Sequence, residues 1–267
     1  MDFVAEMTLR DLGLEEPESP LARYRGALIS ACAIAPPPFG TRRYGEIYRT
    51  AALDPGWVAE TIIKSAEREG DGSTRLWSLA SCTDDGEIRG AVKQHAIDEA
   101  RHARWYLAVL DLVFPGAVER RLRRQLNALS PGYKEDSVLE PVPGSPFAHA
   151  VSVDDLVQMN IAEIRTSVNQ RLQRPVLRAL CHPARIARLD RLLDRLLLDE
   201  IRHVAYSARL IERLATESQE SLDDLMLARI QQFNELTCSE IEDKVFPLHC
   251  SREECRTTGV CVGAESD

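Results

Sequence analysis

The chain has 267 residues, 44% hydrophobic and 28% charged, so one domain, or one domain with extensions, can bury a sizeable core. Its formal net charge of −9 argues against a nucleic-acid or anionic-membrane partner, because both require basic protein surface. No apolar run approaches the roughly 20 residues of a membrane span. The acidic N-terminus lacks a secretory signal pattern, so we expect a cytoplasmic protein.

Leu, Ala, Arg and Glu dominate, and β-branched runs with strict alternation are absent, which predicts an all-α fold. Residues 1–20 should form a loose lead-in, followed by a short helix over 21–34 that ends at a proline run. Asp54-Pro55, a side-chain cap followed by proline, should start the first long helix, which reaches about Cys82. Further helices are predicted at 87–113, 117–129, from about 152 to Pro175 with or without continuation past it, 186–216 and 219–245.

The four central helices are joined by a short, a long and a short connection. Two antiparallel pairs joined by one long crossover form the ferritin-like type of four-helix bundle, here with extra flanking helices. We therefore expect an N-terminal extension with a short helix over 1–50, the bundle with a C-terminal helix over 51–247, and a cysteine-containing tail over 248–267.

The motif Asp-Glu-x-Arg-His occurs twice, at residues 98–102 and 199–203. Its glutamate and histidine are three residues apart on one helical face, so both can bind one metal ion. In both helices this face is otherwise apolar and core-facing, and a buried carboxylate is costly unless it is paired or bound to metal. The two copies therefore predict the metal ligands Glu99, His102, Glu200 and His203.

Each of the other two central helices should supply one glutamate. In the third helix, Glu163 is the only acidic residue in a long interval. In the first helix, Glu69 falls on the stripe of apolar and small residues, whereas Glu67 falls on the solvated face and is the alternative. The poor helix formers among residues 70–73 either distort a turn or leave space for a substrate.

The donor set predicts the metal. Four carboxylates and two neutral imidazoles carry a formal charge of −4, which matches two divalent ions. Oxygen-rich mixed ligation suits Fe(II) or Mn(II), and the lack of thiolates argues against structural zinc. Six protein ligands on two ions also leave open coordination positions at which O₂ can bind.

The order Glu, Asp-Glu-x-Arg-His, Glu, Asp-Glu-x-Arg-His resembles one group of ferritin-like dinuclear iron carboxylate proteins. The group includes bacterial multicomponent monooxygenases, ribonucleotide reductase small subunits and arylamine N-oxygenases, and the resemblance covers about residues 55–216. It implies that some of the glutamates bridge the two ions. By this resemblance, Glu69, Glu99 and His102 bind one ion, and Glu163, Glu200 and His203 bind the other.

The same resemblance assigns the residues around the ligands. Asp98 and Asp199 should accept hydrogen bonds from the free ring N–H groups of the histidines and so set their tautomer and orientation. Arg101 and Arg202 should neutralise these aspartates.

His95 has two interpretations, because it lies one turn before Glu99 on the same stripe. It is either a buried histidine hydrogen-bonded beside the ligands or a third imidazole ligand. The arylamine N-oxygenases have an extra histidine on the other motif helix, where this chain has Leu196. This difference weakens the inference that the chain shares the specific activity of the arylamine N-oxygenases.

Three functions follow from these patterns. The first is an O₂-dependent diiron oxidoreductase, an oxygenase or oxidase that acts on a small organic substrate in biosynthesis by N-oxygenation, hydroxylation or desaturation. The second is a ferroxidase or iron-handling protein, and the third is a non-catalytic helical interaction protein. The expected cofactors are two iron ions, with manganese as the alternative, and O₂. A small-molecule substrate is the expected partner, while an electron donor and a homodimer are left open.

Two further groups of side chains have alternative interpretations. Arg165, Gln170 and Arg171 either bind a substrate carboxylate or lie on an exposed helix face. In the tail, a histidine and three cysteines form either a thiolate-rich zinc site or a flexible segment with reduced thiols. These tail residues are His249, Cys250, Cys255 and Cys261, whereas Cys32, Cys82, Cys181 and Cys238 are predicted to be reduced.

Overall fold

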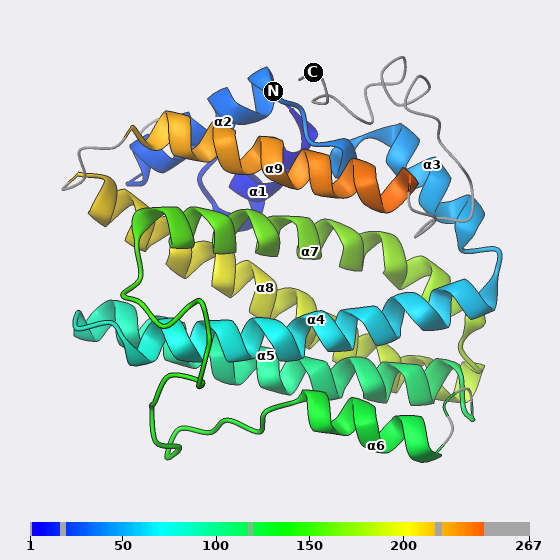
Figure 1. The fold of residues 1–267 in the computed structure, drawn as a ribbon. Helices are drawn as coiled ribbons and strands as arrows, with labels where there is room; N and C mark the ends of the chain where they lie inside the picture. The colour runs from blue at the N-terminus through cyan, green and yellow to red at the C-terminus, as the bar shows by residue number, and fades with distance from the viewer. Residues whose placement is uncertain (1, 17–19, 117, 119, 217–220, 243–267) are drawn as a thin grey trace. The chain divides into compact units, whose positions relative to one another are not determined.

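A computed structural model of the protein describes residues 2–16, 20–116, 118, 120–216 and 221–242, and within these ranges it contains helices and no strand. None of the described helices is both long and apolar enough to cross a membrane. The α-helices are α1 (Phe3–Leu12), α2 (Ala22–Ile34), α3 (Arg42–Ala51), α4 (Pro55–Ser81), α5 (Gly86–Val113), α6 (Arg120–Leu129), α7 (Val153–Leu180), α8 (Ile186–Ala215) and α9 (Leu222–Glu242), with short 3₁₀ helices η1 (Pro38–Gly40) and η2 (Pro183–Arg185) (Figure 1).

The chain divides into two compact units, and the division passes through both α7 and α8. In α8 it falls inside the second copy of the repeated motif, directly before Glu200. Unit 1 contains Met1–Leu53, Val153–Gln173 and Glu200–Asp267, and unit 2 contains Asp54–Ser152 and Arg174–Asp199.

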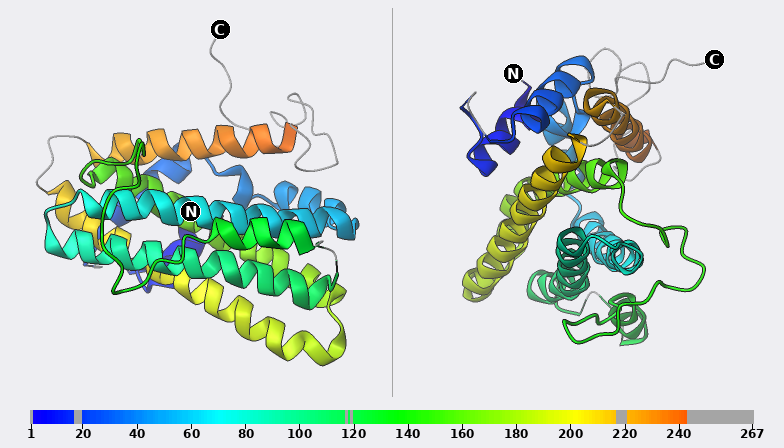
Figure 2. Two further views of the ribbon diagram at one scale, coloured as in Figure 1. Left: turned by 60° about the horizontal axis from the view of Figure 1, so that its bottom comes forward. Right: turned by 90° about the vertical axis from the view of Figure 1, so that its left-hand side faces the viewer.

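In unit 2, α4 and α5 lie side by side along their length (Figure 2). Both helices begin at a side-chain cap: Asp54 accepts a hydrogen bond from the backbone N–H of Gly56 at 2.8 Å, and Asp85 caps α5 in the same way. Between the helices, the Ser73 hydroxyl donates to the carbonyl of Ala96 at 2.6 Å. This bond joins the two helices close to the first copy of the motif.

The long connection from α6 to α7 is anchored on α4 within unit 2. The rings of Trp77 and Tyr133 stack with their centroids 4.0 Å apart. The backbone N–H of Val142 donates to the Ser78 hydroxyl at 3.1 Å. The Pro- and Gly-rich connection is therefore held by specific contacts.

In unit 1, α2 packs against α9 and α1 packs against α2 (Figure 1). A fully buried hydrogen-bond network joins α2 to α7 and α8: the Tyr24 hydroxyl donates to Asn160 Oδ1 at 2.8 Å. The amide of Asn160 donates to the Val204 carbonyl at 3.1 Å and to the Ser207 hydroxyl at 2.9 Å. Leaving such a buried group without its partner costs about 1–3 kcal/mol, so the network specifies this packing.

The helices α7 and α8 are antiparallel, as contacts within each unit show. Asn160 near the start of α7 meets Val204 near the end of α8, whereas Arg174, later in α7, pairs with Asp194 at 2.6 Å. Pro175 lies inside α7, which continues through it to Leu180. Of the two alternatives for the end of this helix, the structure therefore shows continuation.

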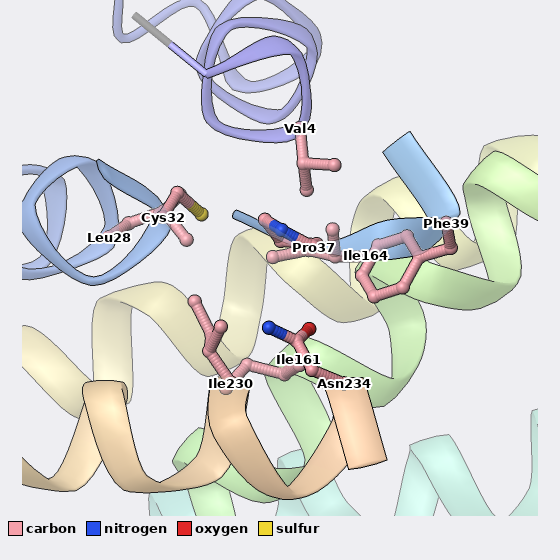
Figure 3. A pocket seen from close by; sticks show the side chains of 9 residues that line it. All are labelled: Val4, Leu28, Cys32, Pro37, Phe39, Ile161, Ile164, Ile230 and Asn234. Atoms are coloured by element: carbon pink, nitrogen blue, oxygen red, sulfur yellow. The ribbon is translucent and has the colours of Figure 1, made fainter. Parts of the chain in front are cut away.

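A small apolar cavity lies inside unit 1 (Figure 3). Val4 from α1 and Asn234 from α9 point into it from opposite sides. Its volume of about 10 Å³ is near the minimum that holds one water molecule. This cavity is therefore too small for an organic substrate.

The N-terminal segment corrects one prediction. The loose lead-in over residues 1–20 is wrong, because α1 forms there. Asp2 caps the helix by accepting from the backbone N–H of Val4 at 2.8 Å, and Gly13 ends it with φ 64°, a conformation that favours glycine. Val4 and Leu9 are buried, so packing onto α2 stabilises this helix. The acidic, Pro-containing composition of the segment did not indicate a helix.

Candidate metal centre

Unit 2 contains a buried set of potential metal ligands, named here the α4–α5 cluster: Glu69 on α4, and Glu99 and His102 on α5. The Nδ1 atom of His102 lies 3.3 Å from Glu99 Oε1 and 3.5 Å from Glu69 Oε2. Two atoms that bind one ion at about 2.1 Å lie about 3.0 Å apart at right angles and about 3.4 Å apart in a tetrahedron. The three side chains therefore have the spacing of ligands to a single ion.

The surroundings of Glu69 distinguish it from its alternative. Glu69 is buried and faces His102, whereas Glu67 is exposed on the same helix. The helix α4 continues without a break through residues 70–73. A Cβ atom added to Gly72 would lie 3.5 Å from Glu99 Oε2, so this glycine leaves space directly beside a predicted ligand. The use of that space by a substrate stays a prediction.

Replacing the two glutamates one at a time tests the choice of ligand on α4. We expect Glu69→Ala to weaken metal binding at least tenfold, because even a residue that only orients a ligand contributes about 10–100-fold. Glu67→Ala, the matched control, should bind metal like the unchanged protein. Metal content after equilibrium dialysis against a fixed concentration of free Fe(II) measures both. The reverse pattern would transfer the ligand role to Glu67.

Charge is distributed unequally within the α4–α5 cluster when no ion is bound. Burial, and after it the charge of Glu99, raises the pKa of Glu69 well above its usual value. For Glu99, burial acts in the same direction, but hydrogen bonds with His102 and His95 outweigh it and hold the pKa well below its usual value. Without an ion, Glu69 thus holds a proton more readily than Glu99 does. A cation bound between them would displace that proton.

The orientation of His102 is set by a carboxylate of the second motif copy. The Nε2 atom of His102 lies 3.1 Å from Asp199 Oδ2, and a carboxylate can only accept a hydrogen bond. Nε2 therefore donates to Asp199, and Nδ1, which faces Glu69 and Glu99, is the ring nitrogen that would bind an ion.

Arg101 lies between the two motif aspartates in unit 2. Its Nη2 atom is 2.6 Å from Asp98 Oδ1 and 3.0 Å from Asp199 Oδ2, so one guanidinium pairs with both carboxylates and offsets part of their charge. Asp98 also accepts a hydrogen bond from Gln94 at 2.9 Å. Arg202, the counterpart of Arg101 in the second copy, is exposed, and its neutralising role stays a prediction.

Unit 1 contains a second set, named here the α7–α8 cluster: Glu163 on α7, and Glu200 and His203 on α8, all buried. The Nδ1 atom of His203 lies 3.4 Å from Glu200 Oε2. A carboxylate oxygen of Glu163 lies within 4.8 Å of a ring nitrogen of His203. Two carboxylates and one imidazole, with Nδ1 of the histidine toward its own motif glutamate, thus occur again.

The polar residues near Glu163 form contacts within unit 1. Gln170 donates from its amide to Glu200 Oε1 at 2.8 Å and so orients a predicted ligand. Arg165 pairs with Glu240 on α9, and Arg171 pairs with Asp11 on α1 at 2.6 Å. Both arginines therefore connect helices, and they lie neither on a free helix face nor at an open carboxylate-binding site. Gln170 is the functional candidate whose role the sequence did not predict.

His95 is almost completely buried on α5, with 1% of its surface exposed. Its Nε2 atom lies 3.4 Å from Glu99 Oε1. The histidine therefore contacts a predicted ligand, as both of its interpretations require.

The four cysteines among the described residues, Cys32, Cys82, Cys181 and Cys238, are free, as predicted for reduced thiols. The predicted alternatives for the tail, a zinc site or a flexible segment, lie outside the described residues.

Fold and site together define an all-helical protein with two buried carboxylate–histidine clusters that could hold metal ions. No protein-family model, curated protein or solved structure matches the chain. An activity can therefore be inferred only from the chemistry of the two clusters.

Proposed function

We propose that the chain binds two iron ions and uses them to activate O₂ for the oxidation of a small organic substrate. The observation that carries the proposal is the repeated donor set: each cluster has two buried carboxylates and one imidazole whose Nδ1 faces its motif glutamate. Each cluster would hold one ion. The fold proposed with this centre is a ferritin-like four-helix bundle whose two hairpins are α4–α5 and α7–α8.

The donor chemistry supports iron over a structural metal. None of the six proposed ligands is a thiolate, and carboxylate oxygens with imidazole nitrogens suit Fe(II), with Mn(II) as the alternative. Two divalent ions would balance the four carboxylates. Burial of these carboxylates would be costly without such compensation.

The residues of the chain would prepare the ions for reaction. A bound pair of Fe(II) ions would supply electrons and open coordination positions to O₂. Asp199 orients His102 by accepting from its Nε2, and Arg101 pairs with both motif aspartates and offsets part of their charge. Gly72 leaves space beside Glu99, and burial of the cluster excludes water, so that the oxidant is used on a substrate.

The reaction of the iron-loaded protein with O₂ tests the proposal. We expect protein loaded anaerobically with about two equivalents of Fe(II) to consume O₂ in one burst and to retain the ferric ions, because the ligands are buried side chains of the chain itself. Excess Fe(II) should not be turned over, and a substrate with a reductant should restore turnover. An oxygen electrode and iron analysis of the desalted protein measure these outcomes.

Two other outcomes would replace the proposal. Continuous oxidation of many equivalents of Fe(II) into a mineral product would identify a ferroxidase. Failure of the protein to bind iron or manganese would leave a non-catalytic helical interaction protein.

A further inference from the structure

We infer that His95 is a metal ligand in addition to the two motif histidines, and that Glu99 on the same helix takes part in binding the ion held by His95. The inference rests on the proposed metal binding. It assigns a ligand role that the repeated motif does not, because the residue four positions before Glu200 in the second copy is Leu196.

Glu99 lies between two imidazoles of its own helix. Its Oε1 atom lies 3.3 Å from His102 Nδ1 and 3.4 Å from His95 Nε2. The group of ligand atoms within 4.8 Å that contains Glu69 and His102 includes Glu99 but not His95. His95 therefore does not share the ion of the α4–α5 cluster, and an ion at its Nε2 would be a second one, with Glu99 between the two.

The direction of side chains on the helix determines which ring nitrogen of each histidine reaches Glu99. Helical side chains lean toward the N-terminus of their helix. His102 follows Glu99 and leans back toward it, so its near nitrogen, Nδ1, faces the carboxylate. His95 precedes Glu99 and leans away from it, and only the far nitrogen, Nε2, reaches the carboxylate. The two histidines thus approach Glu99 Oε1 from opposite directions along the helix axis.

Both His95 and Glu99 are buried. An exposed Glu–His pair four residues apart would be an ordinary surface contact. Here 1% of the surface of His95 and 6% of that of Glu99 is exposed, and Glu99 also contacts His102. Neutral imidazole is a strong ligand for iron and supplies no charge, so ligation by His95 leaves the charge balance between ions and carboxylates unchanged.

The variant His95→Gln separates a ligand from a hydrogen-bond donor. A glutamine amide can still donate to Glu99, but it is a poor ligand for iron. We expect the unchanged protein to retain two Fe(II) ions on dialysis, and His95→Gln to bind one of them at least tenfold more weakly. His149→Gln, which alters an exposed histidine, is the matched control and should retain both ions.

A spectroscopic count of nitrogens provides the second readout. Protein labelled with ¹⁵N-histidine and loaded with iron in a paramagnetic state should show one more coupled imidazole nitrogen by pulsed electron paramagnetic resonance than the His95→Gln variant does. In His95→Gly, added imidazole should restore the second ion by filling the vacated position, which guards against a variant that merely packs badly.

The outcomes separate this inference from the proposed function. Two tightly bound ions with an unchanged nitrogen count in His95→Gln would overturn the ligand role of His95 alone. An unchanged protein that binds no iron would overturn the proposed function and this inference together.

Discussion

Replacing His102 or His203 with alanine should cause the largest loss of function in this protein. Each is the only imidazole of its cluster and lies 3.3–3.4 Å from its motif glutamate. We expect either variant to lose at least one of the two iron ions and to lower O₂-dependent turnover more than about 100-fold, since loss of an orienting residue alone costs about 10–100-fold in metal affinity or activity. Iron analysis of the purified variants and an oxygen electrode measure the two effects.

The control for both variants is His149→Ala, because His149 is exposed and lies outside both clusters. It should retain iron and turnover. A full complement of two ions in both His102→Ala and His203→Ala would show that the clusters are not the metal site.

Removing the metal should lower the stability of the fold by a large margin. An ion present at about 100 times its dissociation constant stabilises the folded state by about 2.7 kcal/mol, so two ions at that level contribute about 5 kcal/mol. In a protein of this size, 1 kcal/mol shifts the melting temperature by about 2–4 °C, so a chelator should lower it by about 10–20 °C. Scanning calorimetry of iron-loaded and chelator-treated protein at one pH measures the shift.

The variant Glu69→Ala provides the control for this second prediction. Because it lacks one ligand and one buried carboxyl group, its melting temperature should respond less to the chelator than that of the unchanged protein. An unchanged melting temperature in protein whose iron has been fully removed would mean that the ions do not stabilise the fold.

Much of the helical architecture could be predicted from local signals. Caps and prolines act within a few residues of the chain, so Asp54-Pro55 marked the start of α4. The helices α1 and α3 were not predicted. They are short and depend on packing against other helices, which local composition does not report.

In the candidate site, periodicity was informative within a helix and uninformative between helices. The 3.6-residue repeat separated the buried Glu69 from the exposed Glu67. It could not show that Asp199 orients a histidine of the other motif copy, because that contact depends on how α5 and α8 pack. Gln170 had a signal that could have been used: it lies seven residues, or about two helical turns, after Glu163 and thus on the same face.

The contact between His102 and Asp199 has a consequence for the order of assembly during synthesis. The two residues are 97 positions apart, whereas α4 and α5 are joined by a short turn and can pair as soon as both have left the ribosome. At that stage His102 has no Asp199 to select its tautomer, so early capture of iron would be weak and reversible. Under the proposed function, tight loading would therefore follow the synthesis and docking of α8.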